Sequence, residues 1–133
     1  MELAKVEALF DKAFPNSGIH IISTGDQRAE VALPKSAQIL RPGNTIASTT
    51  MTMLADTVVY VAIIGEYGEE GLHFVTTGMN IHFLNTAEPG ALLAKAHLIK
   101  TGKRLLTADV ELFDHREVLV AKATLSYMVT SND

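Results

Sequence analysis

A long apolar segment, residues 46–65, is the feature of this sequence that most restricts its fold. It reads IASTTMTMLADTVVYVAIIG and is about long enough to cross a membrane. However, Asp56 lies near its middle and serines and threonines crowd its first half. A charge at the centre of a bilayer costs about 2.5–3.5 kcal/mol, so the segment is predicted to be a helix buried in protein.

The flanking segments have the spacing of one further helix and six strands. Residues 2–14 carry apolar side chains at helical spacing. Alternating apolar and polar residues predict the remaining elements, which are strands over residues 19–23, 29–33, 72–84, 91–101, 103–113 and 117–129. In the first of the four long strands, the side chains expected to share one face are Val75, Met79, Ile81 and Phe83.

These elements predict an α+β domain over residues 1–133. The four long strands are joined by apparent turns, at Pro89-Gly90, Gly102-Lys103 and residues 114–116, which favours an antiparallel meander. The apolar helix must bury its surface, and the concave face of that sheet is the large apolar surface available. At the helix ends, Ser48, Thr49 and Thr50 are expected caps, with Gly65 and Gly68 at the exit.

Composition excludes several classes of protein. The chain has 133 residues, a formal net charge of −4 and no cysteine. Net acidity argues against a general nucleic-acid binder, and the lack of cysteine excludes a disulfide scaffold, a thiol nucleophile and thiolate metal sites. The amphipathic N-terminus does not resemble a signal peptide. We therefore expect a cytoplasmic protein with no nucleic-acid or membrane partner.

Asp56 is the first candidate for chemistry. A carboxylate among Met53, Leu54, Ala55 and Val58 must be paired, protonated or directed into a polar pocket. An acid in such a place is suited to act as a general base or a nucleophile. The alternative is a structural aspartate that bonds a neighbouring threonine or a backbone group.

The start of the buried helix, at Ser48 and Thr49, is the second candidate. Free N–H groups and the helix dipole favour negative charge there, such as a developing oxyanion. Ser48 and Asp56 are eight residues apart, or ~12 Å along a helix at 1.5 Å per residue. One carbonyl group cannot lie ~3 Å from both groups of one chain, so a shared site predicts a dimer with two composite sites.

Other polar residues give weaker signals. Thr76 or Thr77 interrupts an apolar strand and is a candidate to bond water or the carboxylate, although threonine is also common in half-exposed strands. Lys103 and Arg104 form a two-cation turn that suits a phosphate, although such turns are usually only solvated. The five histidines show no metal-ligand spacing, so no metal is expected.

Two stretches together resemble a hotdog-fold thioesterase. These are LRPGNTIASTTMTMLADTVVYVAI and TTGMNIHFLNTAEPGALLAKAHLIKTGKRLLTADVELFD. More narrowly, they resemble the phenylacetate-degradation type within the 4-hydroxybenzoyl-CoA thioesterase superfamily. The resemblance implies a hotdog fold, hydrolysis of acyl-CoA thioesters, no cofactor, and self-association as a dimer or a dimer of dimers.

The resemblance also implies roles for residues. Asp56 matches the family acid, and the N–H that polarises the thioester carbonyl falls at Ser48 or Thr49 of the partner chain. Thr76 or Thr77 matches the polar residue that places water or the acid. Many relatives carry His-Gly-Gly where this chain has Ala47-Ser48-Thr49, and a backbone donor can survive that change. The expected substrate or CoA contacts are Asn44, Met53, Met79, Asn80 (in relatives mainly a structural position), Phe83, Lys103 and Arg104.

Three alternatives remain open at this point. A non-catalytic acyl-CoA or fatty-acyl binding protein on the same fold is favoured by the missing glycine pair. A hydratase or dehydratase acting on acyl thioesters needs a histidine–acid pair, for which His82 is the nearby candidate. A DNA-linked regulator is disfavoured because the assigned elements leave no helix-turn-helix.

Overall fold

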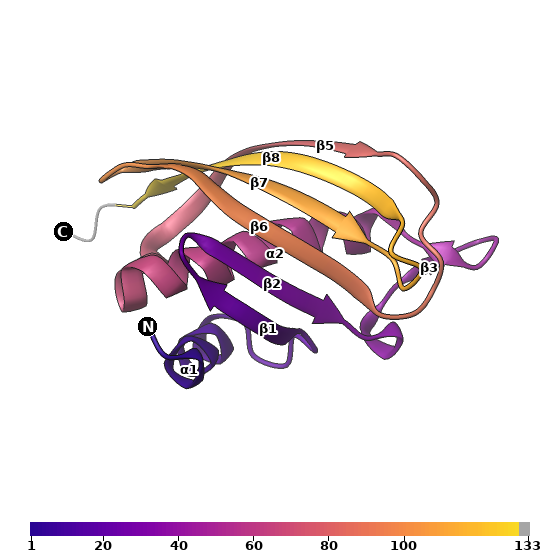
Figure 1. Cartoon of the computed structure of the whole chain (residues 1–133), viewed down its shortest axis with the longest axis horizontal. Coiled ribbons are helices and arrows are strands. Elements are labelled where there is room, and N and C mark those ends of the chain that lie inside the picture. The colour runs from indigo at the N-terminus through magenta and orange to yellow at the C-terminus, as the bar shows by residue number, and fades with distance from the viewer. Residues whose placement is uncertain (131–133) are drawn as a thin grey trace.

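Six antiparallel strands curve around one long helix, α2, in the computed structural model, which describes residues 1–130 (Figure 1). The strand order is β1-β2-β6-β7-β8-β5. The helices are α1 (Leu3–Ala13) and α2 (Ser48–Tyr67), with short 3₁₀ turns at Lys35–Ala37 and Gly68–His73. The strands of the sheet are β1 (His20–Gly25), β2 (Arg28–Leu33), β5 (Phe74–Phe83), β6 (Leu92–Thr101), β7 (Leu105–Phe113) and β8 (Leu119–Val129). A separate hairpin, β3 (Leu40–Arg41) with β4 (Thr45–Ile46), precedes α2. The predicted α+β architecture of a sheet wrapped around a central helix is confirmed.

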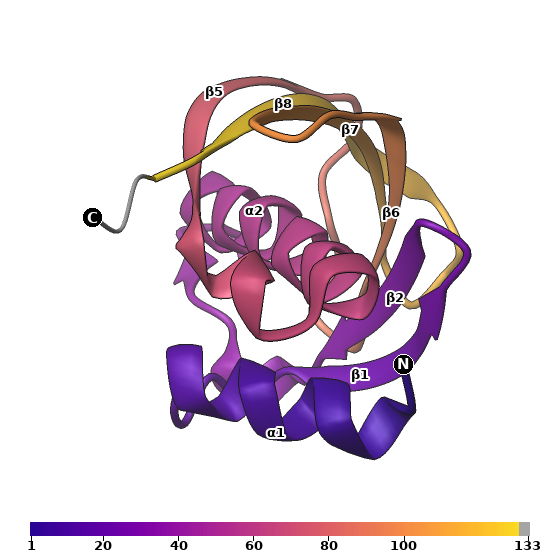
Figure 2. The same cartoon turned by 90° about the vertical axis from the view of Figure 1, so that its left-hand side faces the viewer.

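The apolar segment forms the predicted buried helix. Eleven of the twenty residues of α2 are buried, and the side chains of Val58, Val59 and Ile63 are inaccessible to solvent. By length and composition alone this helix could cross a membrane. In the fold, however, the sheet covers one side of α2, and α1 lies below α2 in the view of Figure 2. Burial of this apolar surface is the main driving force for the fold.

The ends of α2 differ in part from the prediction. The N-cap is Ala47, which provides no side-chain hydrogen bond. Thr50 instead turns its hydroxyl to the preceding loop, where it accepts from the N–H of Ile39. Gly68 ends the helix with φ 65°, as expected, whereas Gly65 lies inside it. A side chain at Gly65 would collide with Thr24 of β1, so this glycine permits close contact between the helix and the strand.

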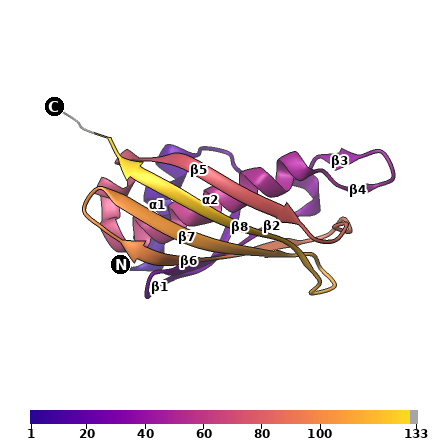
Figure 3. The same cartoon turned by 90° about the horizontal axis from the view of Figure 1, so that it is seen from above.

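The predicted meander is wrong at one strand. β6, β7 and β8 are neighbours in order, but β5 pairs with β8 and forms the far edge of the sheet (Figure 3). Segment 84–91 crosses three strand spacings, ~14 Å, to reach β6, a distance well within the reach of eight residues. β2 pairs with β6 from Arg28↔His97 to Leu33↔Leu92, so that side of β6 is already occupied. Pro89-Gly90 is therefore part of a crossing and not a hairpin turn.

A β-bulge changes the side-chain pattern of β5. Thr76 pairs with Tyr127 and Gly78 with Ser126, which leaves Thr77 as an extra residue. An extra residue reverses the alternation, so Thr76 lies on the same face as Met79. Val75 was expected on that face, but it lies on the opposite one and is 41% exposed. The bulge directs Thr76, and not Thr77, toward α2.

A buried carboxylate ties the β7–β8 turn to the crossing segment. Asp114 accepts hydrogen bonds from the guanidinium of Arg116 and from the backbone N–H of Glu88. Burial alone would raise the pKa of Asp114, but these donors outweigh burial and lower the pKa to about 2. In the crossing segment, the carbonyl oxygen of Ala87 also accepts a hydrogen bond from the N–H of Ile46. This bond holds the crossing segment beside the start of α2.

Candidate functional site

Asp56 lies half-buried on the side of α2 that faces β5 and β8. Its Oδ1 accepts a 2.8 Å hydrogen bond from the hydroxyl of Thr76. The same oxygen accepts a 2.7 Å hydrogen bond from the hydroxyl of Tyr127. The hydrogen bond that the sequence suggested for Thr76 or Thr77 therefore comes from Thr76, while Thr77 donates to Ser126 instead. Both donors are neutral hydroxyl groups, and no cation within residues 1–130 forms an ion pair with Asp56.

Tyr127 was missed as a site residue by the sequence reasoning. It is fully buried, and its pKa is raised by burial and then by the nearby charge of Asp56. Its ring meets that of Tyr60 edge to face, with centroids 5.3 Å apart. The pKa of Tyr60 is raised for the same two reasons, with burial the larger, and its hydroxyl donates to the carbonyl of Phe74. The available signal was that a buried tyrosine needs a partner for its hydroxyl.

A cavity of about 500 Å³ lies beside Asp56. Its walls come from α2, from the last residue of α1 and from the segment that links α1 to β1. The lining residues are Ala13, Phe14, Pro15, Ser17, Ile19, Met53, Asp56 and Thr57. Most of these side chains are apolar, and Asp56 is the one charged residue among them. Met53, a predicted substrate contact, lies here.

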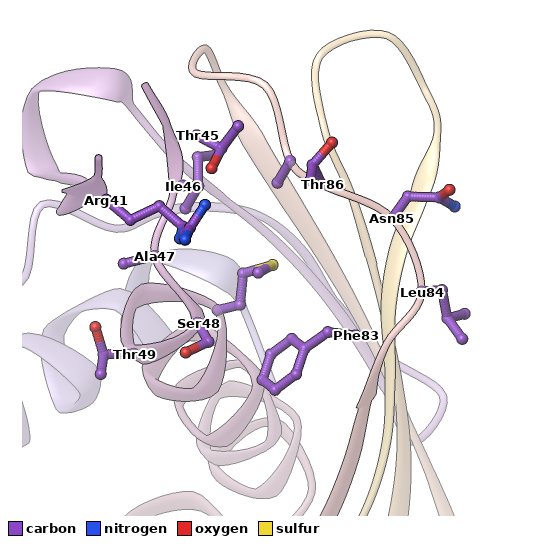
Figure 4. Close-up of a pocket in the computed structure, with 12 residues that line it drawn as sticks. Arg41, Thr45, Ile46, Ala47, Ser48, Thr49, Phe83, Leu84, Asn85 and Thr86 are labelled. Atoms are coloured by element: carbon purple, nitrogen blue, oxygen red, sulfur yellow. The ribbon is translucent and has the colours of Figure 1, made fainter. Parts of the chain in front are cut away.

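A second cavity, of about 490 Å³, opens at the start of α2 (Figure 4). It is lined by Ser48, Thr49 and Phe83, all predicted site residues, and by the side chain of Arg41. Within residues 1–130, the backbone N–H groups of Ser48 and Thr49 have no hydrogen-bond acceptor. These donors, the helix dipole and the Arg41 cation suit an oxygen that carries or develops negative charge.

The remaining predicted contacts lie apart from both cavities. Asn44 lies in the tight turn between β3 and β4, with φ 60°. Met79 and Asn80 line a shallow hollow with Thr124 and Ser126. Lys103 and Arg104 are exposed in the β6–β7 turn, beside the end of α2, where Tyr67 donates to the carbonyl of Gly102. One chain therefore does not bring the predicted site residues together in a single pocket.

The histidines do not form a metal site or a pair with Asp56. No group of three or more histidine, aspartate or glutamate side chains within residues 1–130 is placed to hold a metal ion. His82 pairs in register with Lys122 and is exposed on the outer face of the sheet. That face is opposite to Asp56, which removes the support for a hydratase.

Comparisons with known proteins agree with the fold. The family model described as the thioesterase superfamily matches residues 43–121, more than half of the chain. A zebrafish thioesterase superfamily member 2 structure is 20% identical, covering 98% of this chain and 99% of its own, with a TM-score of 0.81. The E. coli PaaI protein from the phenylacetic acid degradation operon is 25% identical, with 94% and 93% coverage and a TM-score of 0.76. A thioesterase family protein from Silicibacter pomeroyi is 19% identical, with 96% and 97% coverage and a TM-score of 0.83. No curated protein sequence matches the chain.

Proposed function

The chain belongs to the thioesterase superfamily, whose hotdog fold it has, and from that membership we propose that it hydrolyses acyl-CoA thioesters to a free acid and CoA. The observation that carries the proposal is Asp56, a carboxylate held by two hydroxyl groups beside an apolar cavity. Within the described chain one oxygen of this carboxylate accepts both hydroxyl groups, and the other oxygen has no hydrogen-bond partner. Its cavity and its paired donors are what a catalytic acid needs.

Asp56 is proposed to act on the thioester carbonyl in one of two ways. As a general base, it takes a proton from water while the water oxygen bonds to the carbonyl carbon. As a nucleophile, it bonds to that carbon itself, and water later hydrolyses the resulting anhydride. In both routes the bond from carbon to sulfur breaks and the CoA thiolate leaves with the electron pair, to be protonated by solvent.

The start of α2 is proposed to hold the carbonyl oxygen. Negative charge develops on this oxygen as the carbonyl carbon becomes tetrahedral, and preorganised donors lower the barrier. The N–H groups of Ser48 and Thr49 open onto the cavity there and lack acceptors in the described chain. The loss of glycine at these positions leaves both donors in place, because the donors belong to the backbone.

A dimer through β5 is proposed to bring the two parts together. β5 is an edge strand that runs antiparallel to α2, so Thr76 lies beside Asp56 while Phe83 lies at the cavity beside the helix start. If two copies of β5 pair about a two-fold axis, the end of one strand lies beside the beginning of the other. Each Asp56 then approaches the helix start of the partner subunit. This arrangement would satisfy the spacing argument, by which one chain cannot provide both groups.

Five of the other predicted contacts are proposed to join this composite site, whereas Asn44, in the β3–β4 turn, and Asn80, on the outer face of the sheet, are not assigned to it. In one chain, Met53 lines the cavity beside Asp56 and Phe83 lines the cavity at the start of α2. The β5 pairing would place Met53 near the partner's helix-start cavity, and Phe83 near the partner's cavity beside its aspartate. Met79, on the face of β5 that carries Thr76, would join them as part of the acyl pocket. Lys103 and Arg104 have no ion-pair partner within residues 1–130, and we propose that they meet the CoA phosphates.

The test is hydrolysis of a panel of acyl-CoA substrates by wild type, Asp56→Asn and Asp109→Asn. Asp109 is a matched control because it also accepts a hydrogen bond from a threonine hydroxyl, that of Thr124, but lies on the outer face. The chain has no cysteine, so a thiol reagent reports only released CoA. We expect Asp56→Asn to reduce kcat by ~10²–10⁴-fold and Asp109→Asn to retain wild-type activity. Near wild-type turnover by Asp56→Asn would refute the assignment, and binding without release by wild type would favour a non-catalytic acyl-CoA binding protein.

A further inference from the structure

The two oxygens of Asp56 have different surroundings. Oδ1 accepts from both Thr76 and Tyr127, whereas Oδ2 has no hydrogen-bond partner within residues 1–130. Tyr127 has one hydroxyl proton and two nearby acceptors, Oδ1 at 2.7 Å and the backbone carbonyl of Asp56 at 3.2 Å. The shorter contact, to the charged oxygen, is the stronger one. The proton of Tyr127 is therefore directed at Oδ1.

The position of Tyr127 is itself fixed by a row of aromatic rings. Tyr127 contacts Tyr60 at 5.3 Å between centroids, Tyr60 contacts Phe14 at 5.5 Å, and Phe14 contacts Phe10 at 5.1 Å. Packed aromatic rings of this kind restrict each other's rotation. The row runs from α1 to the carboxylate. Tyr127 and α1 both lie outside residues 43–121, so the family match does not include them.

We infer that Tyr127 is a positioning residue, which holds Oδ1 of Asp56 so that Oδ2 is the oxygen presented to the reacting groups. The inference rests on the proposed function, because it assigns a role within the same site. A carboxylate held by one donor alone can rotate about the bond to its Cβ and exchange its oxygens. Two donors from different strands, Thr76 on β5 and Tyr127 on β8, prevent that exchange. The raised pKa of Tyr127 keeps its proton in place across the working pH range.

The test compares Tyr127→Phe with Tyr60→Phe in acyl-CoA hydrolysis. The two tyrosines contact each other, and each donates one hydroxyl hydrogen bond, but that of Tyr60 goes to the carbonyl of Phe74. Both variants keep the ring and lose one hydrogen bond, and we expect the larger decrease in melting temperature in Tyr127→Phe because its hydroxyl bonds a charged group. We expect Tyr127→Phe to lower kcat by about 10- to 100-fold, the range for losing a hydrogen bond to a charged group, with KM within about twofold of wild type. Tyr60→Phe should keep kcat within about threefold.

Each result decides between the positioning role and a structural one. A selective loss of kcat in Tyr127→Phe, at a temperature where both variants are folded, supports the inference, because a residue that only stabilises the fold would leave kcat of the folded protein unchanged. Equal losses in both variants, a loss confined to KM, or wild-type kcat in Tyr127→Phe would overturn it and leave the proposed function standing. Absence of hydrolysis by the wild-type protein on the whole panel would overturn the proposed function and this inference together.

Discussion

Replacing Ser48 by proline removes one backbone donor from the start of α2 without disturbing the helix. Ser48 is the first helical residue, a position where proline is favoured because its N–H has no partner within the helix. Proline also requires an extended residue before it, and Ala47 has φ −66° and ψ 146°. The Ser48 N–H has no acceptor in the described chain, so the fold loses no hydrogen bond. Ser48→Ala is the matched control, since it removes the hydroxyl and keeps the N–H.

The expected loss follows from the role of the donor. Removing one oxyanion donor lowers kcat by about 10²–10³-fold, or about 2.7–4 kcal/mol in the barrier. Ser48→Pro should show this loss, whereas Ser48→Ala should remain close to wild type. Circular dichroism and melting temperature check that α2 remains folded in each variant.

A mixing experiment then tests whether the site is composite. Ser48 and Asp56 are eight residues apart on one helix, ~12 Å, so the proposal places them in different sites of a dimer. Random reassortment of equal amounts of Ser48→Pro and Asp56→Asn makes half of the dimers mixed. In each mixed dimer, one site carries both changes and the other site carries neither. The mixture, refolded together, should recover about one quarter of wild-type activity. Activity no higher than the mean of the two parent variants would refute the two-chain site.

Three further predictions concern the fold around the site. Thr76→Val should lower kcat by about 10-fold or more while Thr77→Val stays near wild type, as initial-rate kinetics will show, because only Thr76 donates to Asp56. Gly65→Ala should lower the free energy of unfolding by about 1–3 kcal/mol in urea titration, because its side chain would meet Thr24. The pKa of Asp114 is about 2 in the fold against 3.8 ordinarily, so its stabilisation is complete above about pH 4 and is lost as the pH falls toward 2. Urea unfolding across that range should show a loss of up to about 2 kcal/mol in wild type that is absent in Asp114→Asn.

The central helix and its acid could be predicted because both signals are local. A long apolar run interrupted by one carboxylate must be buried and must find a partner for the acid, whatever the remainder of the chain does. The strands could be found from alternation for the same reason. The pair formed by Asp56 and Thr76 was suggested by polarity alone, although polarity could not choose between Thr76 and Thr77.

The rest depends on contacts between residues distant in sequence. Alternation identifies β5 but does not give its neighbours, so its place beside β8 and not β6 was missed. The position of the bulge, at Thr77, is fixed only when β5 is laid against β8, and the bulge reverses the face of Val75. Tyr127 lies 71 residues from Asp56, and its alternation with Leu125 and Val129 is that of any core residue. The separation of the two cavities likewise follows from the tertiary arrangement.

The two edges of the sheet differ in a way that limits how an assembly could grow. β5 has ten residues, whereas β1 has six and a shift of register between Ile21 and Ser23. Joining β5 to a second β5 is reciprocal and stops at two chains, but joining β5 to β1 could be repeated without end and would produce a fibre. The short, irregular β1 is a poor template for that repetition. The irregular edge strand β1 thus protects the protein from fibre formation, although the opposite edge strand, β5, is long and open.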